Sequence, residues 1–208
     1  MSAPLLIVTE APVRPEAAEQ AAKEWLGLHA RRPSGAQLYR SVEGADALLE
    51  LRPLDDLNQL PALREEWREQ WDAVAPHLAG DFRRQVQEFV EAPKDIDTPL
   101  PATPYVQLRR VEVKPPVLDE YRAWRDRTIF ETVRGADESE VWLAYHSLLS
   151  TDAGVLFVAG FSCEPERHNG IYKTPAYEAI LEEVREKYIV PVGGEGGLFT
   201  KTYARIGD

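Results

Sequence analysis

One histidine lies inside an apolar run and is the residue of this chain best suited to acid–base chemistry. His146 belongs to "EVWLAYHSLL", residues 140–149, which a polar turn separates from a second apolar run, "GVLFVAGFSC", residues 154–163. An imidazole titrates near neutral pH, so His146 could act as a general base or bind a metal or haem. The alternative is a neutral histidine that hydrogen-bonds to a neighbour in the core. Trp142 shares the face of His146 and would form a pocket wall or plain core, whereas Tyr145 on the other face is expected beneath helices.

The strands expected beside this hairpin carry polar side chains in alternation with apolar ones. Five of these strand residues are predicted to line a cavity, and Phe157 of the hairpin joins them: Tyr105, Gln107, Arg109, Lys201 and Tyr203. Buried polar groups must be paired with each other, with water or with a ligand. We therefore predict that these residues line a small-molecule cavity, with Arg109 and Tyr203 contacting an oxyanion and His146 taking a proton. The alternative is that each lies in solvent at a strand end or on an edge strand.

Composition excludes several classes of function. The formal net charge of −11 disfavours nucleic acid and anionic membranes as partners, because both attract basic surfaces. No apolar run is long enough to span a bilayer, and "MSAPLLIVTE" lacks the basic start of a signal peptide. The single Cys163 permits no internal disulfide, so we expect a cytoplasmic protein. Nucleotide-binding, zinc-protease and serine-hydrolase motifs are absent from the sequence.

A proline-rich segment divides the chain into two halves with the same order of elements. The segment "EAPKDIDTPLPATP", residues 91–104, reads as an extended linker. We predict an N-terminal unit over residues 1–92, a linker over 93–104 and a C-terminal unit over 105–208 that carries the pocket. Each unit reads as strand, helix, hairpin, helix, strand. The expected strands span 5–13, 36–42, 47–54, 82–91, 105–113, 140–149, 154–163 and 197–206, and the expected helices span 15–32, 60–78, 117–133 and 174–189.

This order is that of the ferredoxin-like βαββαβ unit, which places two helices on one face of an antiparallel sheet. The hairpin at 140–163 is apolar on both faces, so its sheet must be covered on both. Helices cover one face, and the sheet of the other half is the simplest cover for the second. The predicted fold class is therefore α+β: two tandem ferredoxin-like units whose sheets face each other in an intrachain α/β barrel with a cavity between them.

With these elements the chain resembles the dimeric α/β-barrel superfamily, and within it the antibiotic-biosynthesis-monooxygenase-like group. The segment "YVQLRRVEVKPPVLDEYRAW" is similar to the opening strand and helix of these units, and "KTPAYEAILEEV" to their second helix. In that superfamily the barrel usually forms from two chains, and this chain resembles a tandem version. The resemblance implies an enzyme of secondary metabolism acting on a hydrophobic, aromatic or polyketide-like substrate. It would be a cofactor-independent monooxygenase, or a cyclase or isomerase, and homodimers could form through the outer helices.

The same resemblance leaves two alternatives. The segment "EEWREQWDAVAPHL" resembles the second helix of haem-degrading members, which implies a substrate contact for Trp67 and haem ligation by His77, or else by His146. Pro76 disturbs the helix end before His77, and the first strand lacks the asparagine of those enzymes. The other alternative is a non-catalytic ligand-binding or assembly protein whose barrel is filled by side chains. His168 is expected at the surface in a loop, and His29 as a partner of a helix C-terminus.

Overall fold

The computed structural model describes residues 1–32, 34–44, 46–152, 154–191 and 197–207. Its strands are β1 (Leu5–Pro12), β2 (Gln37–Ser41), β3 (Ala47–Leu54), β4 (Arg83–Lys94), β5 (Tyr105–Val111), β6 (Val141–Leu149), β7 (Val155–Phe161) and β8 (Leu198–Ile206). Its α-helices are α1 (Ala18–Arg31), α2 (Leu63–Val74), α3 (Leu118–Arg127), α4 (Ile129–Arg134), α5 (Pro165–Gly170) and α6 (Pro175–Lys187). None of these helices is long and apolar enough to cross a membrane.

The strands form one closed barrel in the order β1-β3-β2-β8-β5-β7-β6-β4. Two antiparallel pairings join the halves of the chain: β2 pairs with β8, and β4 pairs with β6. The predicted fold class is confirmed, because both halves follow the βαββαβ order and their sheets meet in a single intrachain barrel. The division of the chain into units stays a prediction; β4 continues to Lys94, and β5 begins at Tyr105.

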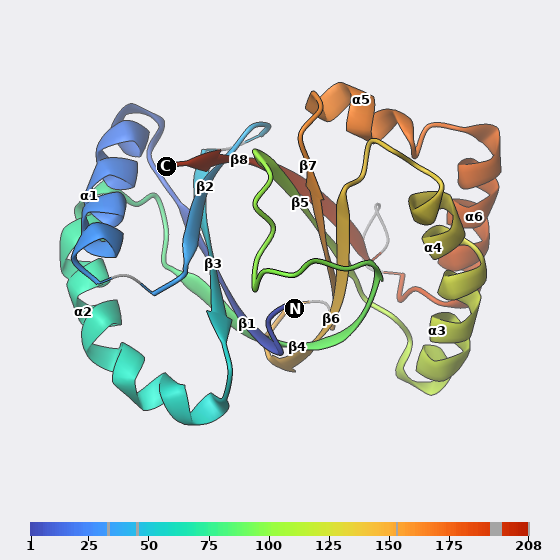
Figure 1. Ribbon diagram of the computed structural model, residues 1–208, viewed down its shortest axis with the longest axis horizontal. Helices are drawn as coiled ribbons and strands as arrows, with labels where there is room; N and C mark the ends of the chain where they lie inside the picture. The colour runs from blue at the N-terminus through green and yellow to red at the C-terminus, as the bar shows by residue number, and fades with distance from the viewer. Residues whose placement is uncertain (33, 45, 153, 192–196, 208) are drawn as a thin grey trace.

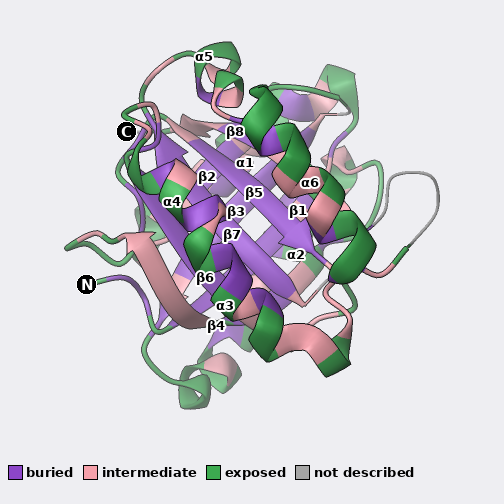
Figure 2. Ribbon diagram, turned by 90° about the vertical axis from the view of Figure 1, so that its right-hand side faces the viewer, coloured by how far each residue is buried: buried purple, intermediate pink, exposed green. Residues whose placement is uncertain are grey.

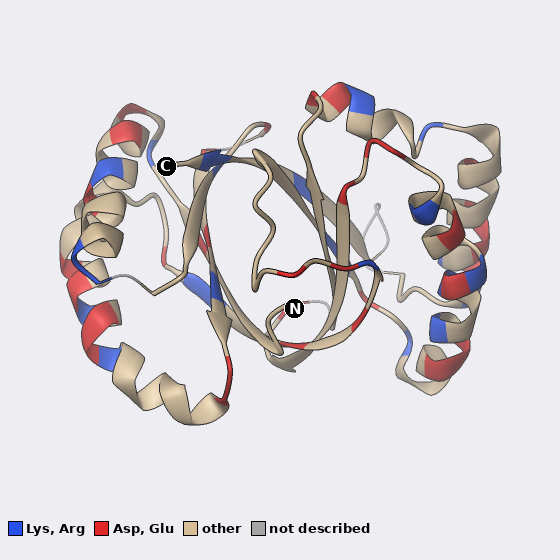
Figure 3. Cartoon of the chain, viewed as in Figure 1, with Lys and Arg blue, Asp and Glu red and all other residues tan. Residues whose placement is uncertain are grey.

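Helices cover the barrel on two opposite sides (Figure 1). Helices α1 and α2 form the N-terminal layer, and α3, α4 and α6 form the C-terminal layer. The outer faces of α3, α4 and α6 are mostly exposed, whereas the strands beneath them are buried (Figure 2). Charged residues are concentrated on both helical layers, with several more on the barrel strands (Figure 3). The Thr174 side chain caps α6 by accepting a hydrogen bond from the backbone N–H of Tyr177, and Pro175 begins the helix, as a helix start favours.

Side chains fill the middle of the barrel. They are almost all aliphatic or tyrosine: Leu6, Val8, Tyr39, Leu49, Leu51, Val106, Leu108, Val141, Leu143, Tyr145, Leu156, Val158 and Tyr203. Tyr145 therefore faces the barrel interior, and the prediction that it lies beneath the helices is wrong. Trp142 faces the helices instead and packs in the C-terminal layer. Alternation revealed the two faces of β6, but because both are apolar it did not reveal which one the helices cover.

Two segments differ locally from their predicted form. The helix predicted over 117–133 is broken into α3 and α4 at Thr128, whose backbone leaves the helical region and whose hydroxyl donates to the Trp124 carbonyl oxygen. The segment predicted as a surface loop forms α5, and His168 within it is fully buried. Pro165 at the first helical position favours this short helix, because proline fixes a backbone angle that suits a helix start.

Candidate functional site

The structure divides the predicted site residues among several places. Five lie on the face of the sheet that is turned toward the C-terminal helices: Tyr105, Gln107, Arg109, Trp142 and Phe157. Two face the barrel interior: Lys201 and Tyr203. Three lie apart from both groups: Trp67 on α2, His77 in the turn after it, and His146, which shares the face of the first group but lies near the end of β6. Three members of the first group, Arg109, Trp142 and Phe157, line a cavity between the sheet and the helices, and Arg109 carries a buried charge there.

Arg109 is a buried cation with polar partners but no carboxylate. Its side chain is 8% exposed; Nε donates to Gln107 Oε1 at 2.8 Å, and Nη1 donates to the Tyr177 hydroxyl at 3.4 Å. No carboxylate of the described chain lies within ion-pair distance of it. An arginine keeps its charge in proteins, so burying it without a counter-ion is costly unless something else compensates. The guanidinium carbon lies 3.4 Å from the ring centroid of Tyr172, which supplies part of that compensation.

The cavity beside Arg109, called the Arg109 cavity below, has aromatic walls. Its lining is Arg109, Val111, Tyr121, Ile129, Trp142, Phe157, Tyr177, Leu181, Val184, Ile189 and Leu198. Trp142 Nε1 and the Tyr121 hydroxyl are buried and have no hydrogen-bond partner. These two donors and the guanidinium all belong to the lining of one cavity, so an acceptor or anion placed there would satisfy groups that the chain leaves unpaired. The volume is about 20 Å³, room for about one water molecule.

Burial keeps the tyrosines around Arg109 in their hydrogen-donating form. It raises the pKa of Tyr121, and it raises the pKa of Tyr177 even though the charge of Arg109 acts in the opposite direction. Both hydroxyls are therefore protonated at neutral pH. Burial also lowers the pKa of His168 to about 4, and the positive charge of Arg109 lowers it further. The imidazole is therefore neutral at pH 7.

A polar and aromatic network holds Arg109 from the side of α5. Gln107 donates to Asn169 Oδ1 at 2.9 Å and to the Thr202 hydroxyl at 3.0 Å, and this fixes the amide that receives the Arg109 hydrogen bond. The His168 ring stacks on Phe161 with 3.8 Å between centroids, and Phe161 stacks in turn on Tyr105. Gln107 and Tyr105 therefore support the cavity, although neither belongs to its lining. This arrangement corrects the expectation that His168 is a surface residue.

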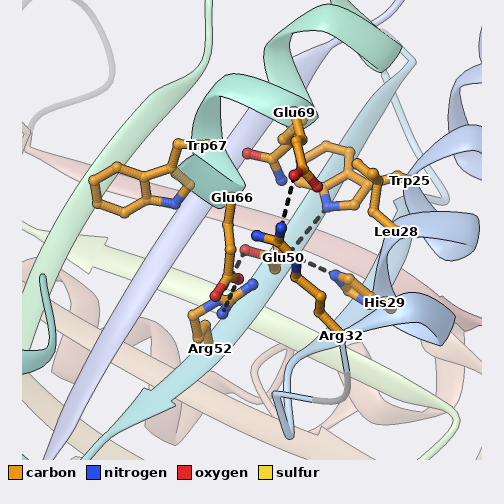
Figure 4. Close-up of a pocket in the computed structure, with 10 residues that line it drawn as sticks. Trp25, Leu28, His29, Arg32, Glu50, Arg52, Glu66, Trp67 and Glu69 are labelled. Atoms are coloured by element: carbon orange, nitrogen blue, oxygen red, sulfur yellow. Dashed lines mark hydrogen bonds and ion pairs between the residues drawn. The ribbon is translucent and has the colours of Figure 1, made fainter. Parts of the chain in front are cut away.

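The N-terminal layer holds a different buried charge, and this one has charged and hydrogen-bonding partners within the chain (Figure 4). Glu50 is 1% exposed, and its Oε2 accepts hydrogen bonds from Trp25 Nε1 at 3.0 Å and His29 Nε2 at 2.6 Å. Arg52 Nε lies 3.5 Å from Glu50 Oε1. Burial alone would raise the pKa of Glu50, but the His29 hydrogen bond and the Arg52 charge outweigh it and hold the pKa below its usual value. His29 is thus the partner of a carboxylate rather than only of a helix end.

The cavity beside Glu50 is as small as the one beside Arg109, about 20 Å³. Trp67 belongs to its lining, with an unpaired Nε1, and the rim carries ion pairs of Arg52 with Glu66 and of Arg32 with Glu69. Trp67 is therefore separated from the other predicted substrate contacts. It lies in the opposite helical layer.

Lys201 and Tyr203 face a third region, at one end of the barrel. The Tyr203 hydroxyl donates to Glu10 Oε2 at 3.0 Å, and Lys201 Nζ lies 3.9 Å from the same oxygen. Burial raises the pKa of Tyr203, and the charge of Glu10 raises it further, so this hydroxyl also remains protonated. Tyr203 and Arg109 were predicted to share one oxyanion. They lie on opposite faces of the sheet, so they do not meet in one site.

The two histidines suggested as haem ligands lie outside the described cavities. His146 is half-buried and His77 lies in a short turn, and neither belongs to the lining of a described cavity. Small-molecule sites usually span about 300–1,000 Å³. The described cavities that approach this size, of about 460 and 410 Å³, contain as histidine only His29, whose Nε2 is bonded to Glu50. No cluster of metal-binding side chains occurs among the described residues either.

Sequence reasoning missed the Glu50 network and the walls supplied by α3, α5 and α6. Signals for the network were present: Glu50 interrupts the apolar strand "ALLELRPL", and Trp25 and His29 are four residues apart on one helical face. For Tyr121, Tyr172 and Tyr177, no local signal distinguishes a cavity wall from ordinary core. Their role follows only from where three separate helices place them.

Solved structures with the same fold cover nearly the whole chain. They include a protein of Fusobacterium nucleatum proposed to be a monooxygenase, with 9% identity, a TM-score of 0.69 and coverage of 99% of this chain and 94% of that one. An anthrone oxidase-like protein has 13% identity, a TM-score of 0.72 and coverage of 98% and 91%. A haem-binding protein of Thermus thermophilus has 20% identity, a TM-score of 0.60 and coverage of 99% and 92%.

Comparison of the sequence with protein-family models and with curated proteins found no match. The assignment of the fold therefore rests on the shared architecture, a closed eight-stranded barrel with helical layers on two sides. The chain has the fold of the antibiotic-biosynthesis-monooxygenase-like α/β barrels, with both ferredoxin-like units in one polypeptide.

Proposed function

We propose that the protein is a small-molecule enzyme that binds an aromatic, enolisable ketone or phenol in the Arg109 cavity and stabilises its anion. The observation that carries this proposal is the buried Arg109 guanidinium, which has no counter-ion among the described residues and shares a cavity lining with the unpaired donors of Trp142 and Tyr121. A substrate oxyanion would supply the missing negative charge. Aromatic walls favour a planar, apolar substrate around that oxygen.

The site suits reactions that begin from an enolate or phenolate. Arg109 lowers the free energy of the bound anion and so lowers the pKa of the bound substrate, whose proton leaves to solvent or to a base. The resulting electron-rich carbon can reduce dioxygen and bond to it, giving after protonation a hydroperoxide that loses water to leave a new carbonyl, which is an oxygenation. It can instead form a C–C bond to a carbonyl of the same molecule, whose oxygen takes up a proton, which is a cyclisation. In enzymes with fixed donors that point at the developing charge, removing one donor lowers the rate by about 10²–10³-fold.

Substrate entry requires the cavity to widen. Helix α6 supplies Tyr177, Leu181 and Val184 to the wall, so a shift of α6 away from the sheet would open space while the strand residues keep their positions. The similarity to an anthrone oxidase-like protein supports the same class of substrate, since an anthrone is an aromatic ketone that enolises.

The test is to titrate the protein with anthrone and 1-naphthol as probes. Tryptophan fluorescence monitors binding, and the absorbance of the ionised probe at constant pH monitors formation of the anion. We expect saturable binding with growth of the anion spectrum, and loss of both in Arg109→Met. Arg127→Met removes one exposed arginine from the same layer and serves as the matched control. Oxygen consumption with anthrone then separates oxygenation from cyclisation. If neither probe binds, or if Arg109→Met binds as well as the natural chain, the proposal is wrong.

The packed barrel favours one other candidate, a non-catalytic assembly protein. Its interior is filled with side chains, and both cavities beneath the helices are small. This candidate predicts no saturable binding of either aromatic probe.

A further inference from the structure

The barrel interior changes character at one end. Beyond the aliphatic middle lies a cavity of about 460 Å³, called the barrel mouth below, within the range of small-molecule sites, which also occur at the mouths of β-barrels. Its lining comes from β1, β4, β5, β8 and the turn between β6 and β7: Glu10, Arg83, Arg110, Glu112, Thr151, Asp152, Phe199 and Lys201. None of these residues belongs to the Arg109 cavity, which lies on the other face of the sheet.

The lining contains three cations and three carboxylates, so its formal charge is zero. Glu10 is already shared: Arg110 donates to its Oε1, Tyr203 donates to its Oε2, and Lys201 lies 3.9 Å from Oε2. Glu10 therefore has little capacity left for a ligand. It fixes Arg110 at the inner end of the cavity.

Some of the remaining charges have no partner among the described residues. Arg110 is 8% exposed and already pairs with Glu10, but its Nε is buried without a hydrogen-bond partner and lies 4.0 Å from Asp152 Oδ2. Arg83 has no ion pair within the described chain, and Lys201 has only its long contact with Glu10. On the acidic side, Glu112 makes no ion pair with a described residue. Asp152 accepts a hydrogen bond from Gln85 and is less free than Glu112. The mouth therefore offers donors together with one carboxylate that has no described partner.

We infer that the barrel mouth binds a small zwitterion that carries one carboxylate and one ammonium group, as an α-amino acid does. The ligand carboxylate would accept from Arg110 Nε, with Lys201 or Arg83 beside it, because arginine pairs well with carboxylates. The ammonium would meet Glu112 and Asp152. A ligand with only one of the two charges would leave the opposite set unpaired and would be repelled by it. Phe199, 47% exposed at the rim, favours an apolar side chain on the ligand.

The test is isothermal titration calorimetry of the full chain with three probes of matched size. They are L-phenylalanine, 3-phenylpropionate, which lacks the ammonium, and phenethylamine, which lacks the carboxylate. We expect L-phenylalanine to bind at least about tenfold more tightly than either of the others, a difference equivalent to about 1.4 kcal/mol. Equal binding of 3-phenylpropionate would show a simple anion site, and equal binding of phenethylamine a simple cation site. Either result, or no heat from L-phenylalanine, overturns the inference.

Variants assign the binding to this cavity. Arg110→Gln removes the buried donor but also releases Glu10, so the barrel could lose stability. Arg83→Gln and Glu112→Gln, at one exposed and one half-buried position, each remove one uncommitted charge and should each weaken L-phenylalanine about tenfold. The matched control is Glu182→Gln on the exposed face of α6, which should leave the affinity unchanged. If both mouth variants bind like this control, the inference fails.

Failure of this inference and failure of the proposed enzyme are separable. Arg109→Met should abolish binding of anthrone and leave the heat of L-phenylalanine binding as it is in the natural chain. Arg83→Gln and Glu112→Gln should weaken binding of L-phenylalanine and leave binding of anthrone as it is in the natural chain.

Discussion

The two helical layers cover equivalent parts of the barrel, yet they treat a buried charge in opposite ways. In the register of β1 with β3, Thr9 is opposite Glu50; in the register of β5 with β7, Arg109 is opposite Phe157. The N-terminal layer thus buries an anion and surrounds it with donors. The C-terminal layer buries a cation and surrounds it with aromatic rings. A charge whose partners come from its own chain stabilises the fold, whereas a charge without a counter-ion is suited to receive a ligand.

The strongest challenge to this comparison is to remove each charge and measure stability. We expect Glu50→Ala to destabilise the protein by about 3–5 kcal/mol, because Arg52 and the Trp25 N–H lose a buried partner. Arg109→Met should change stability by about 1 kcal/mol or less, since it replaces a buried charge that has no described counter-ion with an apolar chain. Denaturant unfolding followed by circular dichroism provides both values.

The matched control for the first substitution is Glu69→Ala, which removes a half-exposed carboxylate paired with Arg32 and should cost no more than about 1 kcal/mol. A large loss of stability in Arg109→Met, equal to that in Glu50→Ala, would show that Arg109 is a structural charge as well.

Enzymatic turnover should depend on the two charges in the opposite order, with Arg109 the more sensitive position. We expect Arg109→Met to reduce turnover of an enolisable aromatic substrate at least about 100-fold, the usual cost of losing an oxyanion donor. Arg109→Lys should recover only part of this loss, because lysine keeps the charge but not the planar set of donors. Steady-state kinetics at fixed pH measures both, with Trp67→Phe in the other layer as a control that keeps normal turnover.

The neutral state of His168 gives the C-terminal layer a dependence on pH. Because its pKa is about 4 in the folded chain and about 6.5 when unfolded, the unfolded chain binds the extra proton between these values. Stability should therefore fall as the pH drops from about 6.5 to about 4, by up to about 3 kcal/mol. His168→Phe keeps a ring on Phe161 and should remove this part of the slope, whereas His77→Phe should retain it. Parallel curves for the natural chain and His168→Phe would refute the assignment.

The smallest effect is expected at His146. It lies on the same face of the sheet as Arg109 but outside the lining of the Arg109 cavity. We expect His146→Ala to change turnover less than about twofold, compared with at least about 100-fold if it were the base. A loss of that larger size would place the chemistry near the end of β6 and would require a different substrate position.

Much of the architecture follows from the periodicity of the chain. The alternation in "FRRQVQEF" and the helical spacing of Trp67 and Trp71 predict the correct elements, and the doubly apolar hairpin predicts a barrel. The same apolar hairpin conceals which face lies under helices, so Trp142 and Tyr145 were assigned to the wrong sides. Alternation identifies Arg109 as a candidate, but its having no carboxylate partner among the residues that the structure describes depends on contacts between distant elements.

The pairing of β2 with β8 and of β4 with β6 inside one polypeptide has a consequence for symmetry. A barrel assembled from two identical chains repeats every residue, so an arginine at this position would occur in both layers. Here Thr9 and Arg109 occupy equivalent places and can differ freely. The molecule is thus pseudo-symmetric in backbone and asymmetric in chemistry. It should accept one aromatic ligand per barrel, where a two-chain barrel of the same shape would accept two.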